Sequence, residues 1–133
     1  MSSSKKKWDF EAADDVHELM IDIVQKLDLN YIRTDRVFCV RSNGSKARAY
    51  ARIWGLSRIF QVTAGYEPTY VIEVLAQHFD KLTDERKTKV IIHELLHIPM
   101  TFSGALRSHR ARHFRVDEKE VEKLFDRLED DYS

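Results

Sequence analysis

Apolar residues recur at intervals of three and four along the first part of the chain. In the segment from Asp9 to Leu29 they are Ala12, Val16, Leu19, Met20, Ile23, Val24 and Leu27. This interval puts side chains on one face of an α-helix, so the pattern predicts an amphipathic helix over residues 9–29. The acidic residues near its start are Asp9, Glu11, Asp14 and Asp15. Negative charge at that end is favoured by the helix dipole.

The pattern changes between residues 31 and 75, where β-branched and aromatic residues stand in short runs. The runs are RVFCVRS, ARAYARIWG, SRIFQVTAG and TYVIEVL, and residues typical of turns separate them. Such runs predict strands. We expect a small sheet of three or four strands, mostly antiparallel because the connections are too short for crossovers. The run GLSRIF also fits a short helix, and the sequence leaves that alternative open.

Two more helices are predicted in the second half of the chain. The segment 82–98 has Thr83 as its expected N-cap, two acidic residues in the first turn, and Pro99 to end it. The segment 116–131 carries Val116, Val121, Leu124, Phe125 and Leu128 at helical spacing. Together with the predicted sheet, these helices indicate an α+β fold.

Composition narrows the class of protein. The chain has 133 residues, which suits one domain, and Lys+Arg and Asp+Glu both total 22. This balance favours neither a nucleic acid nor a membrane surface as the main partner. No apolar run approaches the roughly 20 residues that span a bilayer. We expect a flexible tail at residues 1–8 and a single domain over residues 9–133.

Two further features indicate the cellular compartment. The single cysteine, Cys39, excludes an intrachain disulfide and is typical of a reducing environment. The lysines near the start of the chain are not followed by the apolar region of a secretion signal. We therefore expect a cytoplasmic protein.

The run KVIIHELLHIP carries the main candidate chemistry. His93 and His97 are four residues apart, so a helix brings both imidazoles to one side, where they can bind one tetrahedral zinc ion. Glu94 lies about 100° around the helix from His93, beside the metal, as suits a general base that acts on metal-activated water. Apolar residues occupy most of the remaining circumference. The pattern predicts an embedded helix that is open only along the wedge of these three side chains.

A catalytic zinc ion normally has three protein ligands. The segment after Pro99 supplies two candidates, His109 and His113. A glutamate of the last helix, Glu118 or Glu122, is a further alternative. Histidine is favoured because two of the six histidines of the chain lie in this segment.

The run FDKLTDERKTKVIIHELLHIPMTFSGALRSH resembles the small zinc metallopeptidase family of archaea and phages, through the pattern HELLHIPxxFSGxLRxH. It is similar, more loosely, to SprT-like zincin peptidases. The resemblance implies a minimal zincin-like domain, one zinc ion, a polypeptide substrate, and His93, His97 and His109 as metal ligands. The family often has proline and glycine around the last histidine, where this chain has Ser108 and Arg110. His113 therefore stays open as a rival ligand.

The resemblance also implies that an edge strand near the active-site helix pairs with the substrate, and TYVIEVL or RIFQV would serve. The oxyanion of the reaction needs a hydrogen-bond donor as well. The candidates are Tyr66, Tyr70, Arg107, Arg110 and His113.

A second class of function competes with the zinc metallopeptidase. The region Arg33–Arg58 contains seven basic residues and one acid, interleaved with Tyr50 and Trp54. This pattern is compatible with a nucleic-acid-binding surface, or with ordinary solvated strands. The alternative is therefore a binding module for nucleic acid or protein, in which the metal is structural.

Overall fold

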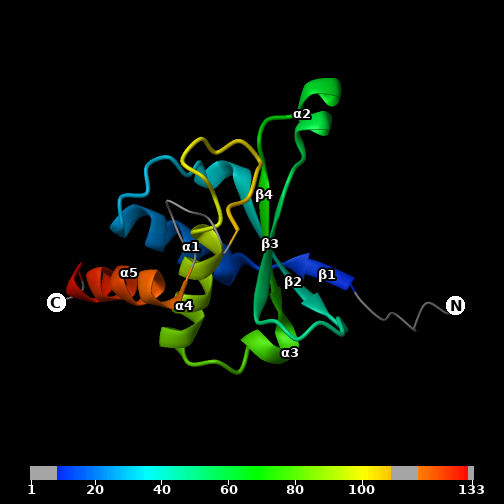
Figure 1. The fold of residues 1–133 in the computed structure, drawn as a ribbon. Helices are drawn as coiled ribbons and strands as arrows, with labels where there is room; N and C mark the ends of the chain where they lie inside the picture. Colours follow the sequence, from blue (N-terminus) through cyan, green and yellow to red (C-terminus); the bar gives the residue numbers. More distant parts are fainter. Residues whose placement is uncertain (1–8, 109–116, 132–133) are drawn as a thin grey trace, which may run out of the picture.

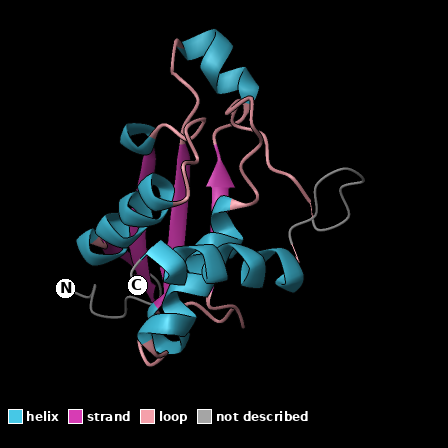
Figure 2. Ribbon diagram, turned by 90° about the vertical axis from the view of Figure 1, so that its left-hand side faces the viewer, coloured by secondary structure: helices cyan, strands magenta, loops and turns pink. Residues whose placement is uncertain are grey.

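Three helices cover one face of a four-stranded sheet in the computed structural model, which describes residues 9–108 and 117–131 (Figures 1 and 2). The helices are α1 (Asp14–Lys26), α4 (Asp84–Leu95) and α5 (Glu118–Asp131). Their apolar faces meet the inner face of the sheet in one core, built around Met20, Ile23, Ile72, Ile91 and Ile92. The α+β class predicted from the sequence is confirmed. In the described part of the chain, no helix is long and apolar enough to cross a membrane.

The sheet has the order β1–β2–β4–β3. Its strands are β1 (Asp9–Ala12), β2 (Val37–Asn43), β3 (Ala51–Gly55) and β4 (Tyr70–Leu75). β1 pairs with β2, and β3 with β4, in antiparallel fashion, whereas β2 and β4 are parallel. The sheet is therefore mixed. The expected sheet was mostly antiparallel because no crossover was foreseen, but the chain passes from β2 to the edge strand β3 and returns in β4, which lies parallel to β2 between the two.

The predicted start of the first helix is wrong. Residues 9–12 form β1, whose register pairs Asp9 with Asn43 and Ala12 with Val40. Only Asp14 and Asp15 lie in the first turn of α1. The helical spacing of the following residues is real, since α1 buries Val16, Met20, Ile23 and Val24. Pairing with β2 decides the state of the four residues before it.

The run SRIFQVTAG forms no strand. Residues Arg58–Ala64 form the short helix α2, which ends at Gly65 in the left-handed conformation (φ 75°). α2 projects from the end of the sheet between β3 and β4, and none of its residues is buried (Figure 1). Ile59 and Val62 are each 67% exposed. The helical alternative left open for GLSRIF is the right one.

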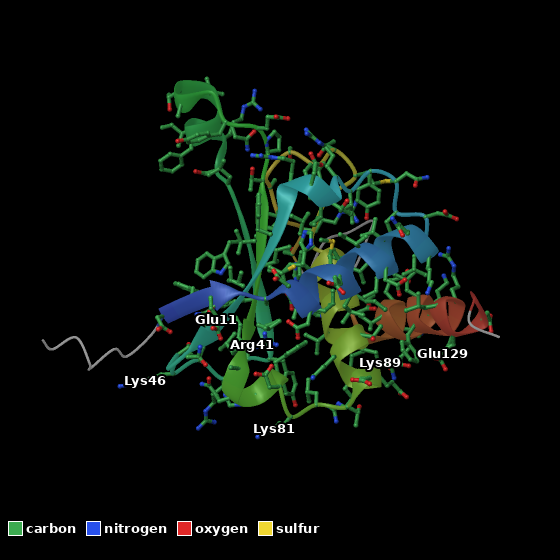
Figure 3. All side chains as sticks on the ribbon, turned by 180° about the vertical axis from the view of Figure 1, so that it is seen from behind. Glu11, Arg41, Lys46, Lys81, Lys89 and Glu129 are labelled. Atoms are coloured by element: carbon green, nitrogen blue, oxygen red, sulfur yellow. The ribbon has the colours of Figure 1, made fainter. Side chains whose placement is uncertain are left out.

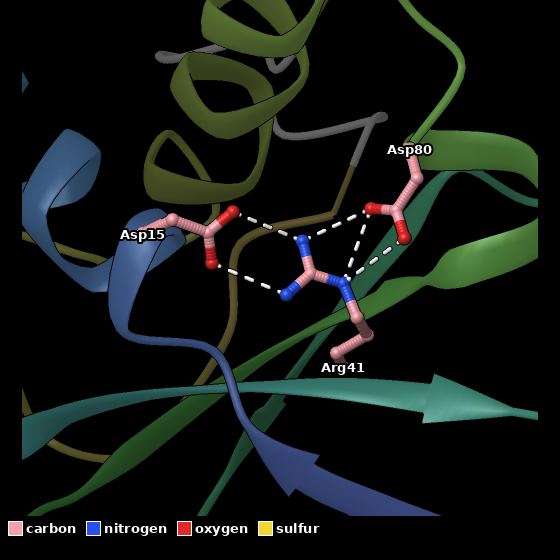
Figure 4. Close-up of polar contacts among 3 residues, drawn as sticks. All are labelled: Asp15, Arg41 and Asp80. Atoms are coloured by element: carbon pink, nitrogen blue, oxygen red, sulfur yellow. Dashed lines mark hydrogen bonds and ion pairs between the residues drawn. The ribbon is translucent and has the colours of Figure 1, made fainter.

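Two further small helices complete the described elements. They are the 3₁₀ helix η2 (Thr34–Arg36) and the helix α3 (Ala76–Phe79), which follows β4 directly. Close to α3, Arg41 of β2 bridges two carboxylates from separate elements (Figure 4). Its guanidinium donates to Asp15 of α1 (Nη2–Oδ2, 3.0 Å) and to Asp80 (Nη2–Oδ1, 2.9 Å). This contact ties the sheet to α1 and to the end of α3.

The two predicted C-terminal helices are present. The side chain of Thr83 accepts a hydrogen bond from the backbone N–H of Arg86, which confirms the N-cap of α4. α5 buries Val121, Leu124, Phe125 and Leu128 as expected. α4 ends at Leu95, earlier than predicted, because its last turn tightens: the N–H of His97 bonds to the carbonyl of Glu94.

Candidate functional site

Two of the predicted residues, His93 and Glu94, lie in the last turn of α4, and His97 lies in the turn that follows it. Ile91, Ile92, Leu95 and Leu96 bury the helix against α1 and the sheet, whereas His93 and His97 are half-buried on its remaining side. The two histidines are thus partly open, whereas Glu94, the third member of the predicted open wedge, is buried. The apolar residues therefore fix the helix, and the fixed helix sets the positions of the polar side chains.

The imidazoles of His93 and His97 lie side by side. Their ring centroids are 5.2 Å apart and the ring planes cross at 71°. Two imidazoles that bind one tetrahedral ion through bonds of about 2.0–2.1 Å have centroids roughly 5 Å apart. The spacing of the two rings therefore fits a shared metal ion.

The backbone of Arg107 holds His97 at two points. The carbonyl of Arg107 lies 2.6 Å from Nδ1 of His97, and the N–H of Arg107 donates to the carbonyl of His97 at 2.6 Å. A carbonyl can only accept, so the proton of the neutral imidazole is on Nδ1 and Nε2 carries the lone pair, which is the form of imidazole that binds a metal. Such a contact fixes the tautomer and orientation of metal-binding histidines. The donor chemistry of His97 thus fits a metal ion.

Glu94 is buried beside the histidines, with 6% of its surface exposed. Burial raises the pKa of its carboxyl group to about 7, because the charged form loses its hydration. The carboxyl faces a cavity of ≈ 700 Å³ that His93 also lines. Its other walls are the start of β3 (Ala49–Ala51), the outer face of α4 and the first turns of α5. A buried carboxyl group thus opens onto a cavity that can hold a substrate.

The comparisons with known proteins fit this geometry. A sequence model of the family described as "putative phage metallopeptidase" matches residues 8–130. The chain belongs to this metallopeptidase family. The match confirms the resemblance to the phage and archaeal family seen in the sequence, and a metallopeptidase family implies a hydrolase and a metal ion. A search of curated proteins gave no match, and neither did a search of solved structures.

The candidates for a third metal ligand lie in different parts of the chain. His109, the predicted ligand, and His113, its rival, lie outside the described residues. Glu118 and Glu122 both line the cavity, and Glu122 is ion-paired with Lys89 at 2.9 Å. Among residues 9–108 and 117–131, no group of three or more His, Cys, Asp or Glu side chains is placed to hold a metal.

The candidates for an oxyanion donor have different positions. Tyr66 is exposed beyond the end of α2, and Arg110 and His113 lie outside the described residues. Tyr70 is fully buried, and its hydroxyl is engaged by the backbone of residues 104 and 105. Arg107 contacts His97 through its backbone. This contact was not predicted from the sequence. The local sequence signal for the loop that makes this contact is Gly104 of the motif FSG, because glycine is typical of a sharp turn.

The basic region Arg33–Arg58 is partly neutralised. Arg33 pairs with Glu67 at 2.8 Å, Arg52 with Glu73 at 2.9 Å, and Arg41 with Asp15 and Asp80. Lys46 extends away from the body at the turn after β2 (Figure 3). Three of the seven basic side chains therefore have carboxylate partners. Binding of a nucleic acid by this region stays a prediction from the sequence.

Proposed function

We propose that this protein is a zinc-dependent metallopeptidase in which His93, His97 and His109 bind one zinc ion and Glu94 is the general base. The observation that carries the proposal is the contact of the Arg107 carbonyl with Nδ1 of His97, beside an imidazole at a suitable distance. This contact places the proton of His97 on Nδ1 and the lone pair on Nε2, and the ring centroid of His93 lies 5.2 Å away, as two ligands of one metal ion require. The buried carboxyl group of Glu94 on the same cavity adds the acid–base group.

Each side chain has a defined task in peptide hydrolysis. When bound, a zinc ion polarises the scissile carbonyl and lowers the pKa of a coordinated water. The Glu94 carboxylate accepts the proton that the attacking water loses and delivers it to the nitrogen of the leaving amine. Its burial keeps bulk water away from that proton. The histidines hold their lone pairs toward the ion because α4 and Arg107 fix their rings.

The assignment of His109 rests on the length of the chain. Arg107 lies against His97 through two hydrogen bonds, and His109 follows only two residues later. Only Ser108 stands between Arg107 and His109 in the sequence, so a short step of the chain, at most about 7 Å for two residues, separates His109 from the residue that contacts His97. His113 is four residues further along and has no such constraint. This argument supports His109 as the third ligand.

Neither segment that the sequence offered for substrate pairing can serve. TYVIEVL forms β4, which is paired on both sides, and RIFQV lies in α2. β3 is an edge strand, and its first residue, Ala51, lines the cavity with His93 and Glu94, together with the two residues that precede β3. We propose that an extended polypeptide pairs with the outer edge of β3 and so lies across the histidines.

Metal content and proteolysis test the proposal together. We expect the purified protein to bind one zinc ion and to cleave an unstructured protein such as casein. Glu94→Gln should retain zinc and lose about 10²–10⁴-fold in rate, because the amide cannot accept the proton. If the wild type binds no zinc, the metal site is wrong. If zinc is bound and both proteins are equally active, Glu94 is not the base; if both are inactive, the metal belongs to a binding module.

The third ligand has its own test in zinc retention. His109→Ala should lose zinc, whereas His113→Ala and Glu118→Gln should retain it. Zinc loss in His113→Ala with retention in His109→Ala would reverse the assignment. Because zinc is measured after dialysis, the result does not depend on finding the right substrate.

A further inference from the structure

The loop between α4 and residue 108 returns to His97 by a tightly specified path. Phe102 and Gly104 have left-handed backbone conformations, with φ of 47° and 95°. Such values at two positions in three residues turn the chain sharply, and for phenylalanine they need external support. The loop then runs past residue 105 to Arg107, whose backbone contacts His97. The geometry of His97 therefore depends on what holds this loop.

Tyr70, at the start of β4, contacts the loop at its sharpest point. Its hydroxyl donates to the carbonyl of Ala105 at 2.7 Å and accepts from the N–H of Gly104 at 2.8 Å. Its ring packs edge-on against Phe102, with centroids 5.0 Å apart. Tyr70 is 0% exposed, so no water replaces these bonds at the surface. One hydroxyl group thus satisfies two successive backbone groups of the loop.

Two other contacts hold the same point of the loop. The side-chain amide of Gln61 donates to the carbonyls of Ser103 (2.9 Å) and Leu56 (2.8 Å). Gly55 lies so close to Gly104 that a Cβ at either residue would collide with backbone atoms on the other side of the contact. The end of β3 and the loop therefore fit together without space for a side chain. These contacts fix where the loop starts its return to His97.

We propose that Tyr70 is a positioning residue for the metal site: its hydroxyl sets the path of residues 104–107 and thereby the contact of the Arg107 carbonyl with His97. The expected effect of Tyr70 on metal binding rests on the proposed function, whereas its expected effect on the tautomer of His97 does not. Tyr70 touches neither imidazole. It acts through the backbone of residues 104–107.

The consequence of removing the hydroxyl follows from this connection. Tyr70→Phe keeps the ring and its contact with Phe102, but leaves the N–H of Gly104 and the carbonyl of Ala105 without their partner. The loop then relaxes, and the contact between Arg107 and Nδ1 weakens. The proton of His97 is free to move to Nε2, where it blocks the ligand bond. Partners of metal ligands typically contribute 10–100-fold to metal affinity.

Two readouts test the role of Tyr70, and the first needs no metal. In the metal-free protein at a pH where imidazole is neutral, nitrogen NMR should show the Nδ1–H form of His97 in the wild type. In Tyr70→Phe it should show a mixture of both tautomers. The second readout is zinc affinity by competition with a chromogenic chelator, which should fall about tenfold or more. Tyr66→Phe, at an exposed tyrosine, is the matched control and should change neither.

A second variant separates positioning from a general loss of folding. Gln61→Leu removes the other polar contact with the loop without touching the core, and it should shift the His97 tautomer and zinc affinity in the same direction. A folded Tyr70→Phe protein with wild-type tautomer and zinc affinity would overturn the proposal. If Tyr70→Phe is unfolded, the result for Gln61→Leu decides. If the wild type binds no zinc, the proposed function fails, while the tautomer still tests the positioning role.

Discussion

At the scale of single residues, two buried glutamates differ in chemistry because they differ in hydrogen-bond partners. Glu94 is buried beside a cavity, and its burial raises the pKa of its carboxyl group to about 7. Glu73 is also buried, but Arg52 and Trp54 donate to its oxygens at 2.9 Å. Burial raises the pKa of Glu73, yet these hydrogen bonds and the charge of Arg52 outweigh it, so the pKa is lowered. A proton can therefore move at Glu94, whereas Glu73 is a fixed anion.

Cys39 should be inert toward thiol reagents in the native protein. The side chain lies on the inner face of β2 and the residue is 7% exposed. Burial, with the negative charge of Asp15, raises the pKa of its thiol to about 12, so almost no thiolate exists at pH 8. We expect no reaction with Ellman's reagent before denaturation and one thiol per chain afterwards. Fast native labelling would contradict the buried position of β2.

At the scale of elements, the structure shows which patterns are local. α4 was predicted from its period, its N-cap and Pro99, which all lie within the segment itself. β1 was missed, and α2 was left undecided between strand and helix, because their states depend on other parts of the chain. Residues 9–12 become a strand by pairing with residues 40–43, and the apolar side chains of α2 face solvent instead of a core. An exposed apolar run gives no signal that distinguishes it from a buried strand.

The Arg41 bridge should matter more than an exposed ion pair. Arg41 is 17% exposed in its side chain and makes several charge-assisted hydrogen bonds to Asp15 and Asp80. Arg41→Met, which keeps the apolar stem, should lower the free energy of unfolding by about 1–2 kcal/mol at pH 7. Arg33→Met is the matched control, because Arg33 and Glu67 are both exposed, and should change the free energy of unfolding far less than Arg41→Met. Equal costs in urea unfolding would contradict a special role of Arg41.

The same bridge predicts a dependence on pH. The hydrogen bonds from Arg41 lower the pKa of Asp15 below its usual value of 3.8. A lowered pKa in the folded state contributes stability above the unfolded value, and this stability is lost as pH falls through the folded value. The difference in unfolding free energy between wild type and Arg41→Met should thus be full at pH 7 and shrink below about pH 4. A difference that stays constant down to pH 2.5 would show that packing, not charge, is the cause.

At the scale of the whole molecule, the candidate site joins local and distant parts of the chain. His93, Glu94 and His97 lie within five residues, so the sequence alone brings them together. Arg107 is ten residues from His97, and Tyr70 lies 34 and 35 residues from the loop groups that it binds. Their roles depend on how β4 and the loop pack, which no spacing in the sequence encodes. The ligands of the proposed site were therefore predictable, and their supports were not.

The core of the protein is built apart from the proposed metal site, which makes metal removal informative. The buried apolar residues of α1, α4, α5 and the sheet form one cluster of their own. We expect EDTA treatment to leave the far-UV circular dichroism spectrum unchanged. Adding zinc at 100 times its Kd should then stabilise the fold by about 2.7 kcal/mol, or roughly 10 °C in Tm for a domain of this size. A structural zinc ion behaves differently, because small domains built around one unfold without it. Loss of the helical signal on chelation would therefore favour a structural metal over the catalytic one, since it would mean that the fold and the site form together.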